Sequence, residues 1–209
     1  MKSPFAAGDE GAAADLAQLR LRFARGASPP DTIYGDQGVR AEGGALTPAS
    51  VLVPIVARPA GLTVLMTRRT AHLRDHSGQI AFPGGRAEPH DPSPEATALR
   101  ETREEVGLDP ARVELLGRLS DYNTRTGYRV TPVIGAVMPP FDLRPDAREV
   151  DEVFEVPLSF LLDPRNHHRH AREFQGRTVH FFAIPYAEYY IWGATAGMLV
   201  NLYRYLAAA

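Results

Sequence analysis

Three glutamates stand close together in the stretch RETREEVGL, residues 100–108: Glu101, Glu104 and Glu105. On a helix of 3.6 residues per turn they fall within an arc of roughly 100°. Glu101 and Glu105, four residues apart, repel each other by roughly 0.2 to 0.5 kcal/mol unless another group compensates the charge. Most charge runs are solvated helix faces. Here the spacing favours a site for Mg²⁺ or Mn²⁺, which prefer carboxylate oxygens and commonly act on phosphate groups.

The helix that must carry these carboxylates has clear ends. Ser93 can cap its first turn, and Pro94 suits the first helical position. Gly107 supplies the stop, so we expect a helix over Pro94–Val106. Leu99 and Val106 lie opposite the glutamates on this helix, which makes one face acidic and the other apolar.

Length and composition limit the class of protein. The chain has 209 residues, which suits one domain with an extension. Its net charge of −2 does not suggest nucleic-acid binding, so a small-molecule substrate is expected. The chain has no Cys, which excludes disulfides and favours a reducing, cytoplasmic compartment. Neither the N-terminus nor the apolar stretch Phe181–Leu206 has the composition of a signal peptide or membrane span, so no membrane association is expected.

Hydrophobic periodicity predicts an α/β fold with a mixed sheet covered by helices. Residues 1–48 are expected to form an extension, with a helix over Ala13–Ala24 and a Gly- and Pro-rich loop after it, and residues 49–209 the domain. Pro54 has no backbone donor, so its strand should lie at an edge or have a free N–H side there. The expected strands are Ser50–Ala57, Leu62–Thr67, Gln79–Phe82, Val113–Leu119, Val130–Met138, Val153–Val156 and Val179–Ile184; further helices are expected at Leu158–Leu162 and Thr195–Leu206.

The glutamate stretch resembles the sequence box of Nudix hydrolases. That box runs Gly, five residues, Glu, seven residues, then Arg-Glu-aliphatic-any-Glu-Glu-any-Gly-aliphatic, and residues 100–108 match its second half except at Thr102. The first half departs more. Gly85 precedes Arg100 by 15 residues, one more than in the box, and Pro92 occupies the position of the expected Glu. The resemblance implies a Nudix fold, a mixed β-sheet sandwiched between α-helices.

The residues before the helix resemble one Nudix subfamily, the coenzyme A diphosphatases. In LMTRRTAHLRDHSGQIAFPGG, residues 65–85, the spacing from Arg74 through Gly78 to FPGG matches that subfamily in full. The lengthened segment GGRAEPHD is also similar to it, as are EVDEVFEVPLSFLLDP and YIWGATAGML farther along the chain. The likeness extends over about residues 49–206.

This resemblance implies a reaction and a metal site. Glu101, Glu104 and Glu105 would bind Mg²⁺ or Mn²⁺ with the carbonyl of Gly85, and Arg100 would orient the glutamates. A metal-activated water would cleave the diphosphate of coenzyme A, releasing 4′-phosphopantetheine and adenosine 3′,5′-bisphosphate. Two alternatives stay open: a Nudix enzyme for another nucleoside diphosphate derivative such as ADP-ribose or a nucleotide sugar, and a non-catalytic Nudix-fold binding module.

The remaining candidates are less sharply defined by the sequence. The general base is expected among Glu105, Glu149 and Glu152, although the last two could be solvent-facing acids before a strand. Substrate phosphates call for arginines, because a guanidinium binds phosphate through two N–H groups. The candidate phosphate ligands are Arg74, Arg69 and Arg68. Gly84 should allow close backbone approach, and Phe82 should pack the loop or touch the ligand. One of the acids Glu88, Asp91 and Glu95 could replace the missing Glu of the box, but loop polarity or complementarity to the helix dipole also explains them.

The stretch NHHRH, residues 166–170, carries three histidines with alternative explanations. No Cys or carboxylate partner lies at a recognisable zinc spacing, so an exposed loop or a basic loop facing the substrate is favoured over a metal site. Trp192 is expected in the core or a pocket wall, and Thr195 is expected to cap the last helix. The sequence leaves open whether the chain forms a homodimer.

Overall fold

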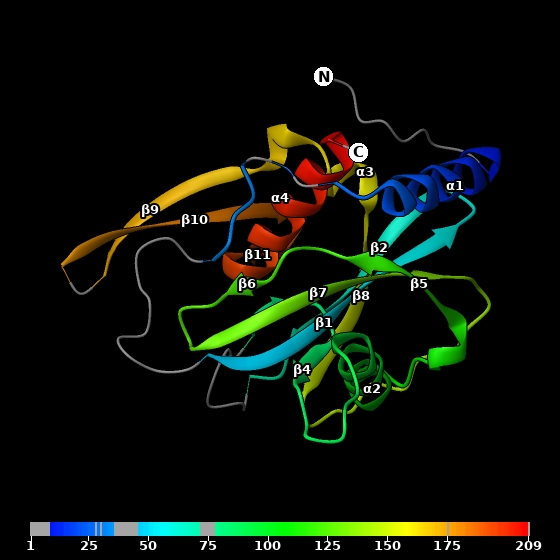
Figure 1. The fold of residues 1–209 in the computed structure, drawn as a ribbon, viewed down its shortest axis with the longest axis horizontal. Helices are drawn as coiled ribbons and strands as arrows, with labels where there is room; N and C mark the ends of the chain where they lie inside the picture. The colour runs from blue at the N-terminus through cyan, green and yellow to red at the C-terminus, as the bar shows by residue number, and fades with distance from the viewer. Residues whose placement is uncertain are drawn as a thin grey trace.

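The computed structural model describes residues 9–27, 29, 31–35, 46–71, 78–174 and 176–208. Its α-helices are α1 (Asp9–Arg25), α2 (Pro94–Val106), α3 (Leu158–Leu161) and α4 (Gly193–Ala208), with 3-10 turns η1 (Pro110–Arg112) and η2 (Pro164–Asn166). Its strands are β1 (Thr47–Arg58), β2 (Gly61–Arg69), β3 (Ile80–Ala81), β4 (Gly84–Arg86), β5 (Val113–Arg118), β6 (Tyr122–Asn123), β7 (Tyr128–Val137), β8 (Val150–Pro157), β9 (His168–Phe174), β10 (Arg177–Tyr186) and β11 (Tyr189–Trp192) (Figure 1).

The larger sheet is mixed, as expected. Strands β3, β2, β1, β7 and β5 lie in that order, and β4, β6 and β8 pair with β1, β7 and β2. Only β1 and β7 among these pairs run parallel. Strands β1 and β2 form an antiparallel hairpin connected by a two-residue turn, Pro59–Ala60.

Pro54 does not lie in an edge strand, because β1 is interior. The pairing of β1 with β2 begins one residue later, at Ile55 and Val64, and the pairing of β1 with β4 ends at Val51. Pro54 therefore lies between the part of β1 that pairs with β4 and the part that pairs with β2. Its strand has a free N–H side there, which was the alternative prediction. The short strands β3 and β4 pair with β2 and β1, and the carbonyl of Pro83 between them accepts a hydrogen bond from the Leu52 amide.

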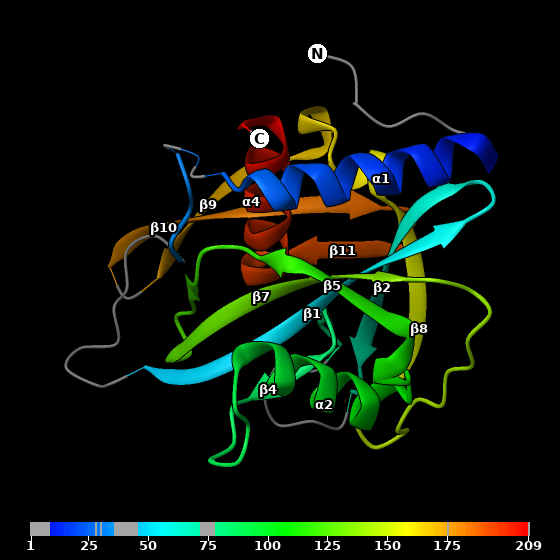
Figure 2. The same ribbon diagram turned by 45° about the vertical axis from the view of Figure 1, so that its right-hand side comes forward.

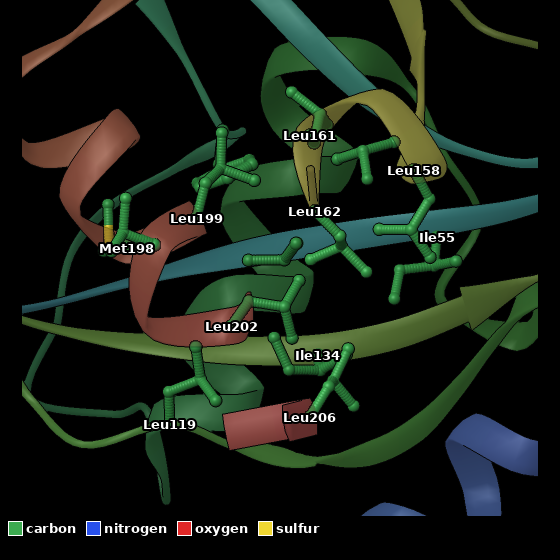
Figure 3. Close-up of a cluster of buried hydrophobic side chains, with 14 of the residues drawn as sticks. Ile55, Leu119, Ile134, Leu158, Leu161, Leu162, Met198, Leu199, Leu202 and Leu206 are labelled. Atoms are coloured by element: carbon green, nitrogen blue, oxygen red, sulfur yellow. The ribbon is translucent and has the colours of Figure 1, made fainter. Parts of the chain in front are cut away.

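Helices cover both faces of this sheet (Figure 2). One face packs against α2 through a small cluster that includes Leu52, Leu65 and Val106. The other face packs against α1, α3 and α4 through the larger core, part of which is seen in Figure 3. There Ile55 and Ile134 of the sheet meet leucines of α3 and α4, namely Leu158, Leu161, Leu199, Leu202 and Leu206.

The N-terminal helix packs on the same core as the sheet. Ala12, Leu16, Leu19 and Phe23 of α1 are buried in the larger cluster, which confirms the predicted amphipathic helix. The division at residue 48 stays a prediction. Most of the expected loop before it, residues 36–45, lies outside the described residues. None of the described helices is long and apolar enough to cross a membrane.

A second, three-stranded sheet is formed by β9, β10 and β11, all antiparallel. The β9–β10 hairpin projects from the body of the molecule (Figure 1). Two expectations were wrong in this region. His168 and His170 lie in β9 rather than in a loop, because they pair with β10. Thr195 does not cap α4, since that helix begins at Gly193 and the Thr195 hydroxyl donates to the carbonyl of Ile80 (3.0 Å).

Candidate functional site

Helix α2 has the predicted limits, and local contacts fix both ends. The Ser93 hydroxyl accepts a hydrogen bond from the Ala96 amide (3.2 Å), which satisfies one of the free N–H groups of the first turn. Gly107 ends the helix with φ of 72°, a left-handed conformation that glycine adopts without strain. Packing of Ala98 and Val106 against the sheet turns one side of α2 inward, so Thr102 and Glu105 are also buried.

The three glutamates occupy different environments. The Glu104 side chain is 59% exposed and the Glu105 side chain only 5%, with Glu101 between them. The Glu105 carboxylate accepts a hydrogen bond from the Gly84 amide (3.1 Å) and lies 3.5 Å from the Arg69 guanidinium. Burial, with smaller contributions from the charges of Glu149 and Glu101, raises the pKa of Glu105 to about 7. The predicted acidic face is thus partly buried rather than solvated.

Arg100 holds the exposed side of the cluster together. Its Nη1 donates to Glu101 Oε1 (2.9 Å) and to Glu104 Oε2 (3.1 Å), as the ion pairing of the resemblance implied. Its Nε and Nη2 donate to the two oxygens of Asp91 at 3.1 and 2.9 Å. Nη2 also donates to the carbonyl of Arg86 (3.0 Å). One guanidinium therefore joins the loop before α2 to two of its glutamates.

Asp91 is the loop acid that the sequence left undecided. Besides Arg100, its carboxylate accepts hydrogen bonds from the Thr97 hydroxyl and the Glu88 amide, both at 2.9 Å. The bonds from Arg100 hold the pKa of Asp91 well below its usual range. Glu88 lies 4.0 Å from Arg100 and Glu95 lies 3.5 Å from Arg118, so neither makes an equivalent contact. Of these three acids, Asp91 makes the bidentate contact with Arg100; that it replaces the Glu missing from the box stays a prediction.

The backbone at Gly84 and Gly85 closes the other side of the site. A Cβ on Gly85 would lie 2.6 Å from Cδ of Glu101, so only glycine lets that carboxylate approach. A Cβ on Gly84 would lie 2.4 Å from the carbonyl oxygen of Ser50 in β1. The pKa of Glu101 is raised, chiefly by burial, and the charges of Glu104 and Glu149 add to the effect. The carboxylates of Glu101 and Glu105 thus lie against the backbone of Gly85 and Gly84, and carboxylate oxygens are the ligands that a hard divalent cation prefers.

The carboxylates of this cluster are not arranged around one common point. Within the described ranges, no three Asp, Glu or His groups converge tightly enough to hold a metal. The Glu104 carboxylate accepts a hydrogen bond from Arg100, so in this arrangement it does not face a metal site. The residue types and the backbone of Gly85 fit a divalent cation, and Glu104 would have to exchange its bond to Arg100 for one to the metal.

Comparison with known proteins identifies the family of this site. The NUDIX domain model matches residues 46–178. The chain belongs to the Nudix hydrolase family. It is 44% identical to the uncharacterized Nudix hydrolase NudL of Photorhabdus laumondii over 154 residues, which are 74% of this chain and 82% of that protein. Its identity to NudL of Escherichia coli K12 is 43% over 155 residues, 74% of this chain and 80% of that protein.

Among solved structures, the Nudix hydrolase RenU of M. smegmatis is similar in chain trace, with a TM-score of 0.48 and 24% identity. The similarity covers 61% of this chain and 80% of that chain. The match to the NUDIX domain model and the identity to the NudL proteins confirm the Nudix fold, together with an activity of its family, hydrolysis of a diphosphate bond. The family typically uses a divalent metal.

The Nudix sheet separates the two later candidates for the base. Glu149 raises the pKa values of Glu101 and Glu105 by its charge, so it lies close to the Nudix glutamates. Glu152 instead accepts a hydrogen bond from the Tyr189 hydroxyl (2.9 Å) and pairs with Arg68 (2.9 Å). The hydrogen bond and the ion pair therefore hold the Glu152 side chain beside β11.

The residues predicted to contact the substrate also lie in different surroundings. Arg68 and Arg69 are neighbours in β2, and they point to opposite faces. Arg69 reaches Glu105, whereas Arg68 pairs with Asp151 and Glu152. Phe82 is 3% exposed and belongs to the core, so it packs the loop. Arg74 lies outside the described residues.

Proposed function

We propose that this Nudix hydrolase cleaves the diphosphate of coenzyme A or of an acylated or oxidised derivative, giving adenosine 3′,5′-bisphosphate and 4′-phosphopantetheine or its derivative. The observation that carries the proposal is the segment at residues 65–85, whose spacing matches the coenzyme A diphosphatases. Its last residues take part in the site, because the Gly84 amide bonds to Glu105 and Gly85 lies against Glu101. A subfamily-specific segment that contacts the Nudix glutamates supports a subfamily-specific substrate.

Glu101, Glu104, Glu105 and the Gly85 carbonyl are the groups that would hold Mg²⁺ or Mn²⁺ in this proposal. When bound, such an ion offsets charge on the diphosphate and lowers the pKa of a coordinated water. The chain itself supplies orientation. Arg100 fixes Glu101, and the Gly84 amide fixes Glu105. The proton of the attacking water would be taken by Glu149 or Glu105, the two candidate bases on the α2 face of the sheet. Arg69, beside Glu105, would contact a substrate phosphate.

A product assay tests the proposal directly. The purified protein is incubated with Mg²⁺ or Mn²⁺ and, separately, coenzyme A, acyl-coenzyme A, oxidised coenzyme A, ADP-ribose and NADH, and the products are identified by mass. We expect adenosine 3′,5′-bisphosphate from at least one coenzyme A species. If none releases it while ADP-ribose or NADH is cleaved, the substrate assignment is wrong and the Nudix activity stands.

A matched pair of variants tests the site. Glu105→Gln removes one buried charge at the centre of the cluster and should lose most turnover while the fold is kept. Glu114→Gln makes the same change at an exposed glutamate of β5 that pairs with Arg20, and it should keep full turnover. Undiminished activity of Glu105→Gln would refute the assignment of this residue.

A further inference from the structure

The segment between β7 and β8 carries Glu149 and passes over the last turn of α2 (Figure 2). The last carbonyls of a helix have no partner within the helix itself. Here the carbonyl of Val106 accepts a hydrogen bond from the Arg144 amide (2.8 Å). The carbonyl of Glu105 accepts another from the Asp146 amide (2.9 Å). Two backbone hydrogen bonds therefore fix this segment to the helix that carries the Nudix glutamates.

A tight turn then leads from Asp146 to Glu149. The carbonyl of Asp146 accepts hydrogen bonds from the amides of Glu149 and Val150, both at 2.9 Å. Its carboxylate also accepts one from the Arg148 amide (3.0 Å). The two ends of such a turn lie within about 7 Å of each other between Cα atoms. Glu149 is therefore one turn away from a residue bonded to Glu105, which explains why its charge acts on the Glu105 carboxylate.

Thr70 holds the other side of this turn. It follows β2 directly and is buried, with 7% of its surface exposed. Its amide donates to the carbonyl of Glu149 (3.0 Å), and its hydroxyl donates to the carbonyl of Arg148 (3.1 Å). Val150, the next residue of the chain, is buried in the cluster that packs against α2. Two successive carbonyls of the turn are thus bonded to one threonine.

The Glu149 side chain depends on this backbone for its position. It is exposed, and it forms no hydrogen bond or ion pair with another described residue. A general base must lie within hydrogen-bond distance of the proton that it takes. The Glu149 carboxylate has no side-chain partner of its own in the described structure to hold it there. Its distance from an attacking water is therefore set by the turn that carries it.

We propose that Thr70 is a positioning residue for the hydrolysis, because its hydroxyl holds the turn from which the Glu149 carboxylate reaches the attacking water. This inference rests on the proposed function and deepens it, since it assigns the proton of the water to Glu149 rather than to Glu105. Thr70 acts through Glu149 alone. Loss of the hydroxyl should therefore lower turnover and leave the binding of substrate and metal as it is.

Two substitutions separate the hydroxyl from the shape of the side chain. Thr70→Val removes the hydroxyl, whereas Thr70→Ser keeps it. With coenzyme A as substrate, or ADP-ribose if coenzyme A is not cleaved, Thr70→Val should lower kcat about fivefold, the weight of one neutral hydrogen bond. KM and the metal concentration for half-maximal activity should stay as in the wild type, and Thr70→Ser should restore kcat. A change of KM or of metal activation in Thr70→Val would mean a general distortion of the site and would overturn the proposal.

A double-mutant cycle with Glu149→Gln tests whether Thr70 acts through Glu149. If it does, Thr70→Val lowers kcat no further in the Glu149→Gln background. If the two losses multiply, or if Thr70→Val keeps full kcat while Glu149→Gln does not, the positioning is refuted and the proposed function stands. If Glu149→Gln keeps full kcat, the inference fails and Glu105 is left as the base. The coenzyme A assignment depends on the released products and is decided separately.

Thr32→Val is the matched control. The Thr32 hydroxyl is also partly buried and donates to a backbone carbonyl, that of Pro29 (2.8 Å), in the segment after α1. Urea unfolding should show a similar loss of stability in Thr32→Val and Thr70→Val, because each loses one hydrogen bond of the same kind. Only Thr70→Val should lose turnover. An equal fall of kcat in Thr32→Val would show that the effect is not specific to the turn of Glu149 and would refute the positioning.

Discussion

Replacing Asp91 by Asn removes the charge that anchors Arg100 while keeping the shape of the side chain. Two of the four hydrogen bonds at Asp91 come from Arg100, and the Asp91 side chain is only 5% exposed. Removing one partner of a buried ion pair costs about 3 to 5 kcal/mol. Arg100 keeps Glu101, Glu104 and the Arg86 carbonyl, and Asp91 is covered mainly by its own partners near the protein surface. We therefore expect a smaller loss of unfolding free energy, about 2 kcal/mol.

The effect on catalysis follows from the other bonds of Arg100. Without Asp91 as an anchor, the guanidinium is free to follow Glu101 and Glu104, and the Glu101 carboxylate loses its fixed position. Misplacing one such group costs roughly tenfold in rate for each 1.4 kcal/mol of lost transition-state stabilisation. We expect kcat to fall about tenfold and the metal concentration for half-maximal activity to rise, with KM for the substrate little changed.

The measurements are urea unfolding of the metal-free protein and a metal titration of the initial rate. Glu88→Gln is the control, because Glu88 also lies near Arg100, at 4.0 Å, but its side chain is 49% exposed. This variant should behave as the wild type. Equal losses in the two variants would mean that net charge near Arg100 matters rather than the bidentate contact, and no loss in Asp91→Asn would refute the anchoring.

Three further predictions concern single side chains. Glu149→Gln should lower kcat at least tenfold and Glu152→Gln less than threefold, in the product assay, because only Glu149 adds charge at the glutamate cluster. Gly85→Ala should weaken metal activation strongly in a metal titration, since the new Cβ would lie 2.6 Å from Cδ of Glu101; wild-type behaviour would contradict that packing. Burial lowers the pKa of His167, so the folded protein prefers the neutral ring; stability should be lost as the pH falls below about 6.5, and His167→Gln should flatten this part of a melting-temperature profile.

Helix α2 could be predicted to the residue because its limits are set locally. Ser93, Pro94 and Gly107 act within one turn of each end, and the burial of Thr102 follows once the helix is placed. In contrast, β4 contains Gly84 and Gly85, which have no strand preference, and it exists because β1 supplies its hydrogen-bond partners. Such tertiary pairing leaves no signal in the residues of β4 themselves.

Strand β9 was missed for a related reason. Its residues 168–172, HRHAR, show no alternation of apolar and polar side chains, which is the usual sign of a strand. The face that β9 presents with β10 is aromatic and cationic rather than apolar, so it does not read as a core face. The signal that was available is His168, His170 and Arg172 at every second position, opposite a strand containing Phe181.

At the site, residue spacing predicted the glutamates but could not rank their exposure. The helical period of 3.6 residues places Glu101, Glu104 and Glu105 on one face. The tertiary contact of Glu105 with the Gly84 amide distinguishes Glu105 as the buried glutamate. Likewise, three acids before and at the start of α2 were candidates, and the turn in which the Glu88 amide bonds to Asp91 decides which of them reaches Arg100. Both choices depend on the path of a loop, which sequence periodicity does not encode.

The distribution of charge explains why the box tolerates its altered first half. Asp91, Glu101 and Glu104 share the single guanidinium of Arg100, and Glu105 lies 3.5 Å from Arg69, so these four carboxylates outnumber the two guanidiniums that pair with them. If the acid before α2 pointed into the cluster, it would add to this excess of negative charge. Asp91 instead faces Arg100 from the loop side, with its charge compensated there. An anchoring acid can therefore move along the loop, provided that it reaches Arg100, whereas the glutamates of α2 cannot move without changing the site that a cation would occupy.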